Sequence, residues 1–237
     1  MNEEDSVLLK RYDRFLADSM HTLKNLIAPI STYVEMLQSG LVGEQKADEI
    51  NEKIGVCANT ATQFCTSLMN VFRIRGGLAD FRPEKINPHD MLQEYLLMIE
   101  NNLQFKRIIV KNQLDPEVFL FCNANLLSSV FTNLITNAIK FSFEDGTITV
   151  SGESVDKEYY VIRVKDEGVG IDEAKIEEKL RNNTDYFTRG TMNESGTGLG
   201  LLLVQAILEK NNGSLRAYNN KDKGATFEFT LPLYKEK

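Results

Sequence analysis

The sequence of 237 residues predicts an α+β protein in two parts, a helical hairpin in residues 1–76 and an α/β sandwich in residues 77–237. Two observations predict the hairpin: apolar residues recur at heptad spacing in two successive segments, and no convincing strand precedes Gly76. A third predicts the sandwich, because strand-like and helix-like runs are mixed from about Phe81 onward. The pair Gly76-Gly77 marks the expected boundary.

Two apolar stripes run along the hairpin residues. Gly40 and Gly43 separate the stripes and predict a short turn. A single hairpin cannot bury both stripes completely, so we expect a homodimer in which two hairpins form a four-helix bundle. The first stripe, with Ser19 as its one polar member, contains Tyr12, Leu16, Leu23, Leu26, Ile30, Tyr33 and Leu37, and the second contains Ile50, Ile54, Cys57, Ala61, Cys65, Leu68 and Phe72.

The remaining residues predict six strands and three helices. Helices are expected near residues 88–101, 124–141 and 199–211. Strands are expected near residues 108–111, 118–121, 147–152, 159–164, 214–218 and 226–232. This order favours a mixed sheet with helices on one face.

Composition excludes several classes of partner and location. The net charge is −7 and no basic block offsets it, which argues against nucleic acid as the main partner. Cys57, Cys65 and Cys122 lack metal-site spacing and cannot all pair, so we expect free thiols in a reducing cytoplasm. The chain has no run of eighteen apolar residues, and its first residues are acidic, so we expect neither a membrane segment nor a signal peptide.

Three short segments suit the parts of a nucleotide. In Asn133-Leu-Ile-Thr-Asn137-Ala-Ile-Lys140, two amides and an ammonium group share one face of an expected helix, which suits a metal-bound phosphate. In Asp166-Glu-Gly168-Val-Gly170, the glycines after a strand-like run let the backbone approach a flat ring. The third segment, Gly196-Thr197-Gly198-Leu199-Gly200, opens a helix with free backbone N–H groups, as a phosphate cradle does.

Each segment alone has a simpler interpretation. An amide pair is more often a solvated face or a helix cap, glycine pairs after strands usually mark turns, and glycine-rich runs occur in many loops. The three together, in this order, resemble the N, G1 and G2 boxes of the sensor histidine kinases, and the resemblance runs essentially end to end. That family shares its ATPase domain, the Bergerat fold, with gyrase, mismatch-repair and heat-shock ATPases.

The resemblance implies roles for the residues of these boxes. Asp166 would accept the adenine amino group, and Asn137 would be a ligand of Mg²⁺. Lys140 and the glycines of the third segment would meet the phosphates. Phe187 and Thr188 lie in a segment that looks like the F box, at the start of a mobile lid expected over residues 181–195. The nucleotide-binding residues are then Asn133, Asn137, Lys140, Asp166, Gly168, Gly170, Phe187, Thr188, Gly196, Thr197, Gly198, Leu199 and Gly200.

Asn133 bears on the fate of the phosphoryl group. The gyrase-like ATPases have a glutamate at this point that activates water. An amide cannot take up a proton at neutral pH, so Asn133 argues against plain hydrolysis.

His21 is the expected phosphoacceptor. The segment around it resembles the H box of the family, and the heptad set by Leu16 and Leu23 puts His21 at the f position, farthest from the seam. The alternative, a solvated surface histidine, would be preferred from helix position alone. His89, the other histidine, follows Asn87-Pro88 at an expected helix start, where a capping or first-turn role is favoured.

The H box departs from its family after His21. Thr22 stands where the family has Glu or Asp, so the carboxylate that would hold one ring N–H is missing. The loss of such a group lowers rates by roughly 10²- to 10⁴-fold. The family's proline five residues after the histidine is also missing, and Pro29 comes three residues later. Asn25, four residues after His21, keeps the family's pattern, in which Thr or Asn positions a water that hydrolyses the phospho-aspartate of the partner. The alternative is that Asn25 is an ordinary polar residue on a solvated helix face.

These observations leave three functional hypotheses. The first is a dimeric histidine kinase core that binds ATP and Mg²⁺, phosphorylates His21 and passes the group to an aspartate of a response-regulator receiver domain. The second, motivated by Thr22, is a kinase-impaired scaffold or phosphatase of a phosphorylated response regulator. The third is a gyrase-like ATPase without phosphohistidine. No input module is visible, which indicates either a core cut from a longer protein or one that senses through partners.

Overall fold

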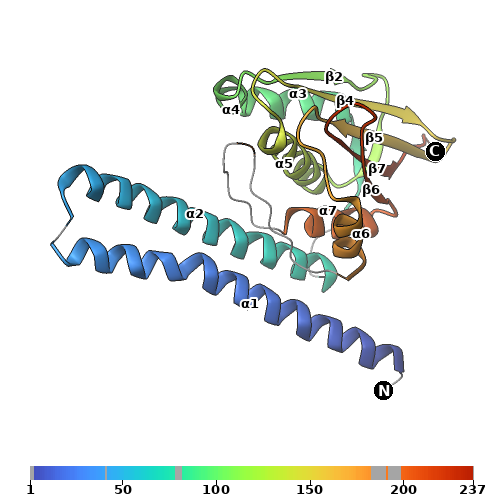
Figure 1. Ribbon diagram of the computed structural model, residues 1–237. Coiled ribbons are helices and arrows are strands. Elements are labelled where there is room, and N and C mark those ends of the chain that lie inside the picture. The colour runs from blue at the N-terminus through green and yellow to red at the C-terminus, as the bar shows by residue number, and fades with distance from the viewer. Residues whose placement is uncertain (1–2, 41, 78–81, 183–190, 192–198, 237) are drawn as a thin grey trace.

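The computed structural model describes residues 3–40, 42–77, 82–182, 191 and 199–236. Figure 1 shows a long helical hairpin beside an α/β domain. The expected α+β class and the order of its two parts are therefore confirmed. The segment expected as a lid, residues 181–195, lies largely outside the described residues; its first two belong instead to the end of a helix, Glu173–Asn182.

Two long helices form the hairpin, α1 (Glu3–Gln38) and α2 (Glu44–Arg75). Helix α1 continues through Pro29, and Gly40 takes a positive φ of 68° in the turn that follows. The helices pack through a small aromatic and aliphatic core, in which the rings of Phe15 and Phe72 meet edge to face with centroids 5.8 Å apart. Ser19, the polar member of the first stripe, is fully buried there.

The hairpin leaves part of its apolar surface uncovered. On α1, Leu16, Met20 and Ile27 are 43%, 60% and 45% exposed. On α2, Val56 and Met69 are also exposed. Of these five residues only Leu16 belongs to the two stripes, so the uncovered apolar surface of the hairpin lies mainly outside them.

A mixed five-stranded sheet forms the centre of the α/β domain, in the order β2-β4-β5-β7-β6. Strands β2 and β4 pair in parallel, and the other neighbours pair antiparallel. A separate antiparallel pair joins β1 to β3. The strands are β1 (Glu84–Ile86), β2 (Ile109–Gln113), β3 (Leu120–Cys122), β4 (Thr147–Ser154), β5 (Tyr159–Lys165), β6 (Leu215–Asn219) and β7 (Ala225–Pro232).

Helices α5 and α7 supply most of the helical part of the domain core. Their apolar residues pack with the strands, and the rings of Phe131 on α5 and Phe229 on β7 meet edge to face at 6.2 Å. The helices are α3 (Pro88–Met98), α4 (Glu100–Phe105), α5 (Ala124–Phe141), α6 (Glu173–Asn182) and α7 (Gly200–Lys210). Helix α5 has the expected bounds, whereas the single helix expected near residues 88–101 is divided into α3 and α4, and β1 and α6 were not expected.

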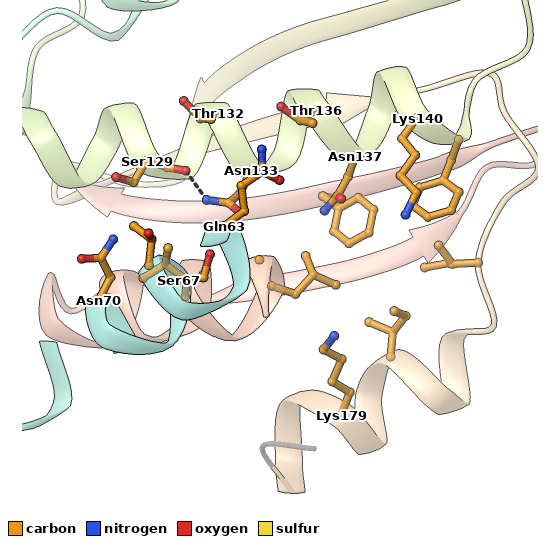
Figure 2. Close-up of a pocket in the computed structure, with 18 of the residues that line it drawn as sticks. Gln63, Ser67, Asn70, Ser129, Thr132, Asn133, Thr136, Asn137, Lys140 and Lys179 are labelled. Carbon is orange, nitrogen blue, oxygen red and sulfur yellow. Dashed lines mark hydrogen bonds between the residues drawn. The ribbon is translucent and has the colours of Figure 1, made fainter. Parts of the chain in front are cut away.

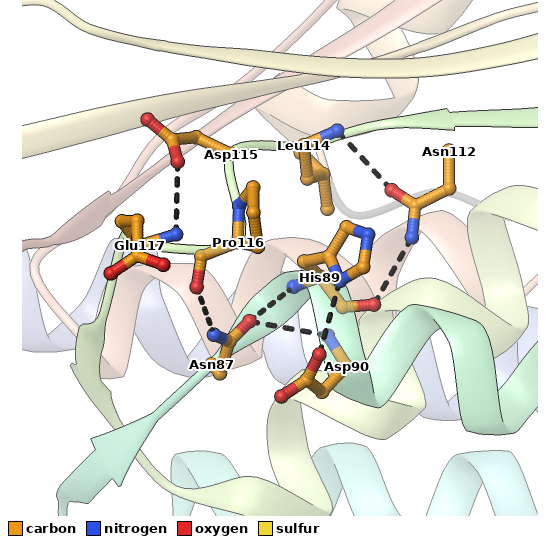
Figure 3. A network of polar contacts seen from close by, with 8 residues as sticks. All are labelled: Asn87, His89, Asp90, Asn112, Leu114, Asp115, Pro116 and Glu117. Atoms are coloured by element: carbon orange, nitrogen blue, oxygen red, sulfur yellow. Dashed lines mark hydrogen bonds and ion pairs between the residues drawn. The ribbon is translucent and has the colours of Figure 1, made fainter.

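Asn87 fixes the start of α3 (Figure 3). Its Oδ1 accepts hydrogen bonds from the backbone N–H groups of His89 and Asp90, at 2.9 and 3.1 Å, while its Nδ2 donates to the carbonyl of Pro116. His89 Nδ1 lies 3.0 Å from Asp90 Oδ1. The expected first-turn place of His89 is thus confirmed, and Asn87 is the capping residue.

The three cysteines are free. Burial raises the pKa of the Cys122 thiol to about 12, which keeps it protonated and unreactive at neutral pH. A search of the described helices finds none with the length and apolar character needed to span a membrane.

Candidate nucleotide site

A cavity of about 710 Å³ lies where α2 meets the α/β domain. Figure 2 shows the amides and hydroxyls of α5 facing those of α2 across it, with α6 closing the far side. Such a volume is in the range of cofactor and nucleotide pockets. The residues that line it are Thr62, Gln63, Thr66, Ser67 and Asn70 of α2; Ser128, Ser129, Thr132, Asn133, Thr136, Asn137, Lys140 and Phe141 of α5; Val169, Gly170, Ile171 and Asp172; Ile176 and Lys179 of α6; and Gly200, Leu201, Leu203 and Phe227.

Helix α5 presents the amide face that the sequence predicts. Asn133, Asn137 and Lys140 all line the cavity. Asn133 Nδ2 donates to the carbonyl of Ser129 at 2.8 Å, so its Oδ1 is turned toward the start of α7. A Cβ added to Gly200 would lie 2.6 Å from that oxygen, so a larger residue at this position would displace the Asn133 amide.

A buried lysine stabilises the end of α5. Lys106 is 2% exposed, and its Nζ donates to the carbonyls of Ile139 and Lys140 and to Thr191 Oγ1, at 3.0, 3.0 and 2.9 Å. A cation at a helix C-terminus is stabilised by the helix dipole. Thr191 in turn donates its backbone N–H to the carbonyl of Lys140 and its hydroxyl to that of Ser142. The backbone that carries Lys140 is thus fixed from two sides.

Asp166 lies at the end of β5 and is 3% exposed. Its Oδ1 accepts hydrogen bonds from the N–H groups of Gly168 and Ala225, at 2.8 and 3.2 Å. Burial raises the pKa of the carboxyl, and the two hydrogen bonds oppose that rise. Both of these bonds are made to Oδ1, so Oδ2 is the carboxylate oxygen that they leave for a further donor.

The glycines after Asp166 are required by close packing. A Cβ at Gly168 would collide with the carbonyl of Phe141 at the end of α5. Gly170 has a φ of 77°, and a Cβ there would lie 2.6 Å from Asn219 Oδ1. Both positions need glycine for a steric reason.

Two asparagines that sequence reasoning missed hold this loop in place. Asn219 accepts from the N–H of Ile171 at 2.8 Å through Oδ1 and donates to its carbonyl at 2.9 Å through Nδ2. Asn220 Nδ2 donates to the carbonyl of Asp166 at 2.8 Å. Asn-Asn followed by Lys-Asp-Lys-Gly reads as a turn, so nothing in the sequence distinguished these amides from ordinary turn residues.

The other expected nucleotide-binding residues either do not line the cavity or lie outside the described residues. Asp166, Gly168 and Leu199 are buried and are not among the residues that line the cavity, and Leu199 is fully inaccessible. Phe187, Thr188, Gly196, Thr197 and Gly198 lie outside the described residues.

His21 is exposed on α1, as its heptad position predicts. Asn25 Nδ2 lies 3.2 Å from His21 Nδ1, which leaves Nε2 as the open ring nitrogen. Thr22, by contrast, is 8% exposed and lies on the buried side of the helix. No described residue of α1 lines the cavity, so the structure does not bring His21 together with the nucleotide-site residues.

The donor set fits Mg²⁺ only when the ion arrives with phosphates. Within the described ranges, no three His, Cys, Asp or Glu side chains are placed to hold a metal ion. Mg²⁺ typically takes one or two protein oxygens together with water and substrate phosphates. The amide oxygen of Asn137 in the cavity wall can supply one such ligand.

Comparison with known proteins agrees with this geometry. Residues 122–235 match the family described as histidine kinase-, DNA gyrase B-, and HSP90-like ATPase. Sporulation kinase E of Bacillus subtilis is 35% identical over 114 residues, which are 48% of this chain and 15% of that protein. The cell-division control histidine kinase PdhS of Brucella canis is 23% identical over 92% of this chain and 22% of its own length. The chain thus spans less than a quarter of either relative.

Solved structures share the fold. The Acinetobacter baumannii histidine kinase AdeS has a TM-score of 0.71 at 20% identity, over 91% of this chain and 98% of that one. The histidine kinase ThkA, crystallised in complex with the response regulator protein TrrA, has a TM-score of 0.73 at 17% identity, over 98% of this chain and 66% of that one. Residues 122–235 therefore belong to the histidine kinase-, DNA gyrase B-, and HSP90-like ATPases, and the relatives that match the chain are named as kinases, which supports the predicted sensor histidine kinase.

Proposed function

We propose that the chain is a histidine kinase core that phosphorylates itself on His21 from ATP and Mg²⁺ and passes the phosphoryl group to a response-regulator aspartate. The observation that carries this proposal is the cavity that unites Asn133, Asn137, Lys140, Gly170 and Gly200, separated in sequence but adjacent in space.

The parts of ATP fit different parts of this site. Asp166 Oδ2 would accept from the adenine amino group, since Oδ1 is held by two backbone donors. Asn137 would hold Mg²⁺, which neutralises charge on the triphosphate. Lys140, fixed at the end of α5, would stabilise the γ-phosphate during transfer. Asn133 provides no carboxylate to activate water, which favours transfer over hydrolysis.

His21 would attack through Nε2. A bond forms between Nε2 and the γ-phosphorus while the bond from phosphorus to the leaving oxygen of ADP breaks. The lone pair must be on Nε2, so the ring proton must be on Nδ1. Asn25 Oδ1 would then accept a hydrogen bond from this Nδ1–H. The Asn25 amide must first rotate, because in the structure its Nδ2 faces the ring. Asn25 thereby takes over part of the orienting role that Thr22, buried and uncharged, does not supply.

Transfer requires His21 to reach a cavity that α1 does not line. Helix α2 packs on α1 and, on its other side, mainly against α7 of the α/β domain (Figure 1). Either the α/β domain moves relative to its hairpin, or His21 of a second copy reaches the cavity. A second copy is supported by the exposed apolar side chains of α1 and α2, which a four-helix bundle would cover.

Incubation with γ-labelled ATP and Mg²⁺ tests the proposal. The wild type should take up label that is lost in acid and that transfers to a receiver domain. His21→Ala should take up none, while the matched variant His89→Ala should label normally because His89 serves the start of α3. Label that persists in His21→Ala contradicts the assignment of the phosphoacceptor, and release of phosphate without labelled protein contradicts the kinase proposal.

A further inference from the structure

The turn between β6 and β7 lies against Asp166 at the end of β5. Asn220, the first residue of this turn, donates from Nδ2 to the carbonyl of Asp166 at 2.8 Å and to that of Lys223 at 2.9 Å. A Cβ at Gly224, which has a φ of 77°, would collide with the carbonyl oxygen of Asp166. The turn is therefore in direct contact with an aspartate that lies 54 positions earlier in the sequence.

The contacts engage the N–H, the carbonyl and Oδ1 of Asp166. Its N–H donates to the carbonyl of Ala225 at 2.9 Å, and its carbonyl accepts from Asn220. Oδ1 accepts from the N–H groups of Gly168 and Ala225. Because the main chain and one carboxylate oxygen are held, the position of Oδ2 is fixed relative to the sheet.

Thr226 fixes the amide orientation of Asn220. Its hydroxyl donates to Asn220 Oδ1 at 2.7 Å, and Thr226 is only 3% exposed. The carbonyls of Asp166 and Lys223 can only accept, so they require Nδ2 on their side of the amide, in agreement with the hydroxyl at Oδ1. A hydrogen-bond network that engages both ends of an amide restricts its rotation. Asn220 is thus a rigid link between β7 and Asp166.

The position of this carboxylate matters because purines differ in the group that it would meet. Adenine presents an amino group, which donates, at the place where guanine presents a carbonyl oxygen, which accepts. A carboxylate oxygen accepts from the first and repels the second. Guanine has other N–H donors, which a displaced carboxylate would reach. Selection between the two bases therefore depends on how firmly Asp166 is held.

We propose that Asn220 is a positioning residue for purine selection, because it holds the main chain of Asp166 so that Oδ2 accepts from adenine and rejects guanine. The inference rests on the proposed ATP binding. It adds to the site a residue from outside the three nucleotide-binding segments, and Asn220 acts through Asp166 rather than by touching the base.

Calorimetric titration of the whole chain with ATP and with GTP, in the presence of Mg²⁺, tests this role. The wild type should prefer ATP. In Asn220→Ala the affinity for ATP should fall about 10-fold, the effect of losing one orienting hydrogen bond. The affinity for GTP should change little, since GTP makes no bond to the positioned oxygen. Thr226→Val should lower the ratio of ATP to GTP affinity by less, and Thr226→Ser should restore it.

Asn112→Ala is the matched control, because Asn112 also joins two segments but does not line the cavity. Its Nδ2 donates to the carbonyl of His89 at 3.1 Å, and its Oδ1 accepts from the N–H of Leu114 at 3.2 Å (Figure 3). Asn112→Ala should lower the thermal stability and leave the ratio of ATP to GTP affinity unchanged. A purely structural role of Asn220 would give the same result in Asn220→Ala.

The outcomes separate this inference from the proposed function. If the wild type binds neither nucleotide, both are wrong. If the wild type binds ATP and Asn220→Ala keeps the same ratio of ATP to GTP affinity, only the role of Asn220 is wrong. A wild type that binds ATP and GTP equally also overturns that role. Should Asn220→Ala fail to fold, Thr226→Val and Thr226→Ser provide the comparison, and an unchanged ratio in Thr226→Val then contradicts the inference.

Discussion

The α/β domain and the hairpin differ in how completely one chain buries their apolar residues. In the domain, the central residues of the sheet and of α5 and α7 are inaccessible, and Leu134, Ile148 and Phe229 are all 0% exposed. In the hairpin, Met20 and Met69 remain 60% and 63% exposed. A sheet covered by helices closes its own core, whereas two helices present at least one apolar face outward. The core of the domain is thus closed within one chain, whereas the hairpin leaves apolar side chains exposed that the proposed second copy would cover.

The largest expected effect is on the close packing of the domain. Gly168→Ala would drive a methyl group into the carbonyl of Phe141. We expect the free energy of unfolding to fall by about 3 kcal/mol and nucleotide binding to be lost. Gly55→Ala is the matched change in the hairpin, where a Cβ meets nothing within 4 Å. It should stabilise α2 by about 0.5–1 kcal/mol. Thermal and urea unfolding of both variants checks the contrast, and a neutral Gly168→Ala would show that the loop is not packed as described.

A smaller effect is expected from charging the uncovered face of the hairpin. Ile27→Glu should weaken self-association at least about 100-fold. In a dimer each copy would lose a buried apolar side chain and would bury a carboxylate in its place. Val155→Glu, at an exposed apolar residue of the α/β domain, should leave association unchanged. Analytical ultracentrifugation over a range of concentrations measures both. Equal association of Ile27→Glu and the wild type would show that this face does not mediate dimer formation.

The smallest effect is the pH dependence that Asp166 gives the domain. Its folded pKa is raised above the ordinary 3.8 by burial, so the ionised carboxylate costs stability above the folded pKa, and this cost is recovered as the pH falls from there toward 3.8. Asp166→Asn should therefore be the more stable protein without nucleotide at neutral pH, and the difference should vanish toward pH 3.8.

The same substitution should weaken ATP binding. Because two backbone N–H groups hold Oδ1, the amide would present Nδ2 where the carboxylate presents Oδ2, and two donors would face each other at the adenine amino group. Calorimetric unfolding and nucleotide titration across pH 4–8 check both parts. An Asp166→Asn protein that binds ATP as the wild type does would contradict the assigned role of the carboxylate.

The sequence predicted what depends on periodicity and missed what depends on packing. The bounds of α5 follow from its apolar spacing and its Asn123 cap, and all six expected strands are present. Strand β1 has three residues, Glu-Lys-Ile, which is too short a run to show alternation. Helix α6 has few apolar residues, so its stripe of Ile176 and Leu180 was not recognised.

Site residues follow the same division. The face of Asn133, Asn137 and Lys140 is a property of one helix and could be read from spacing alone. The clamp of Asn219 on Ile171 joins segments 48 residues apart, and no local pattern reveals it. Thr22 shows a limit of sequence reasoning even within one helix, because the heptad gives the direction of its side chain around α1 but not the extent of its burial, and Thr22 is 8% exposed.

Helix α2 has one face in the hairpin and another in the wall of the nucleotide cavity, where Gln63, Ser67 and Asn70 lie opposite Asn133 (Figure 2). Such a position makes hairpin geometry and nucleotide occupancy thermodynamically linked. If a displacement of α2 changes the affinity for nucleotide by a given factor, bound nucleotide changes the equilibrium constant of that displacement by the same factor. If the cavity binds ATP as proposed, the concentration of ATP changes the position of α2, just as a movement of α2 changes the affinity for ATP.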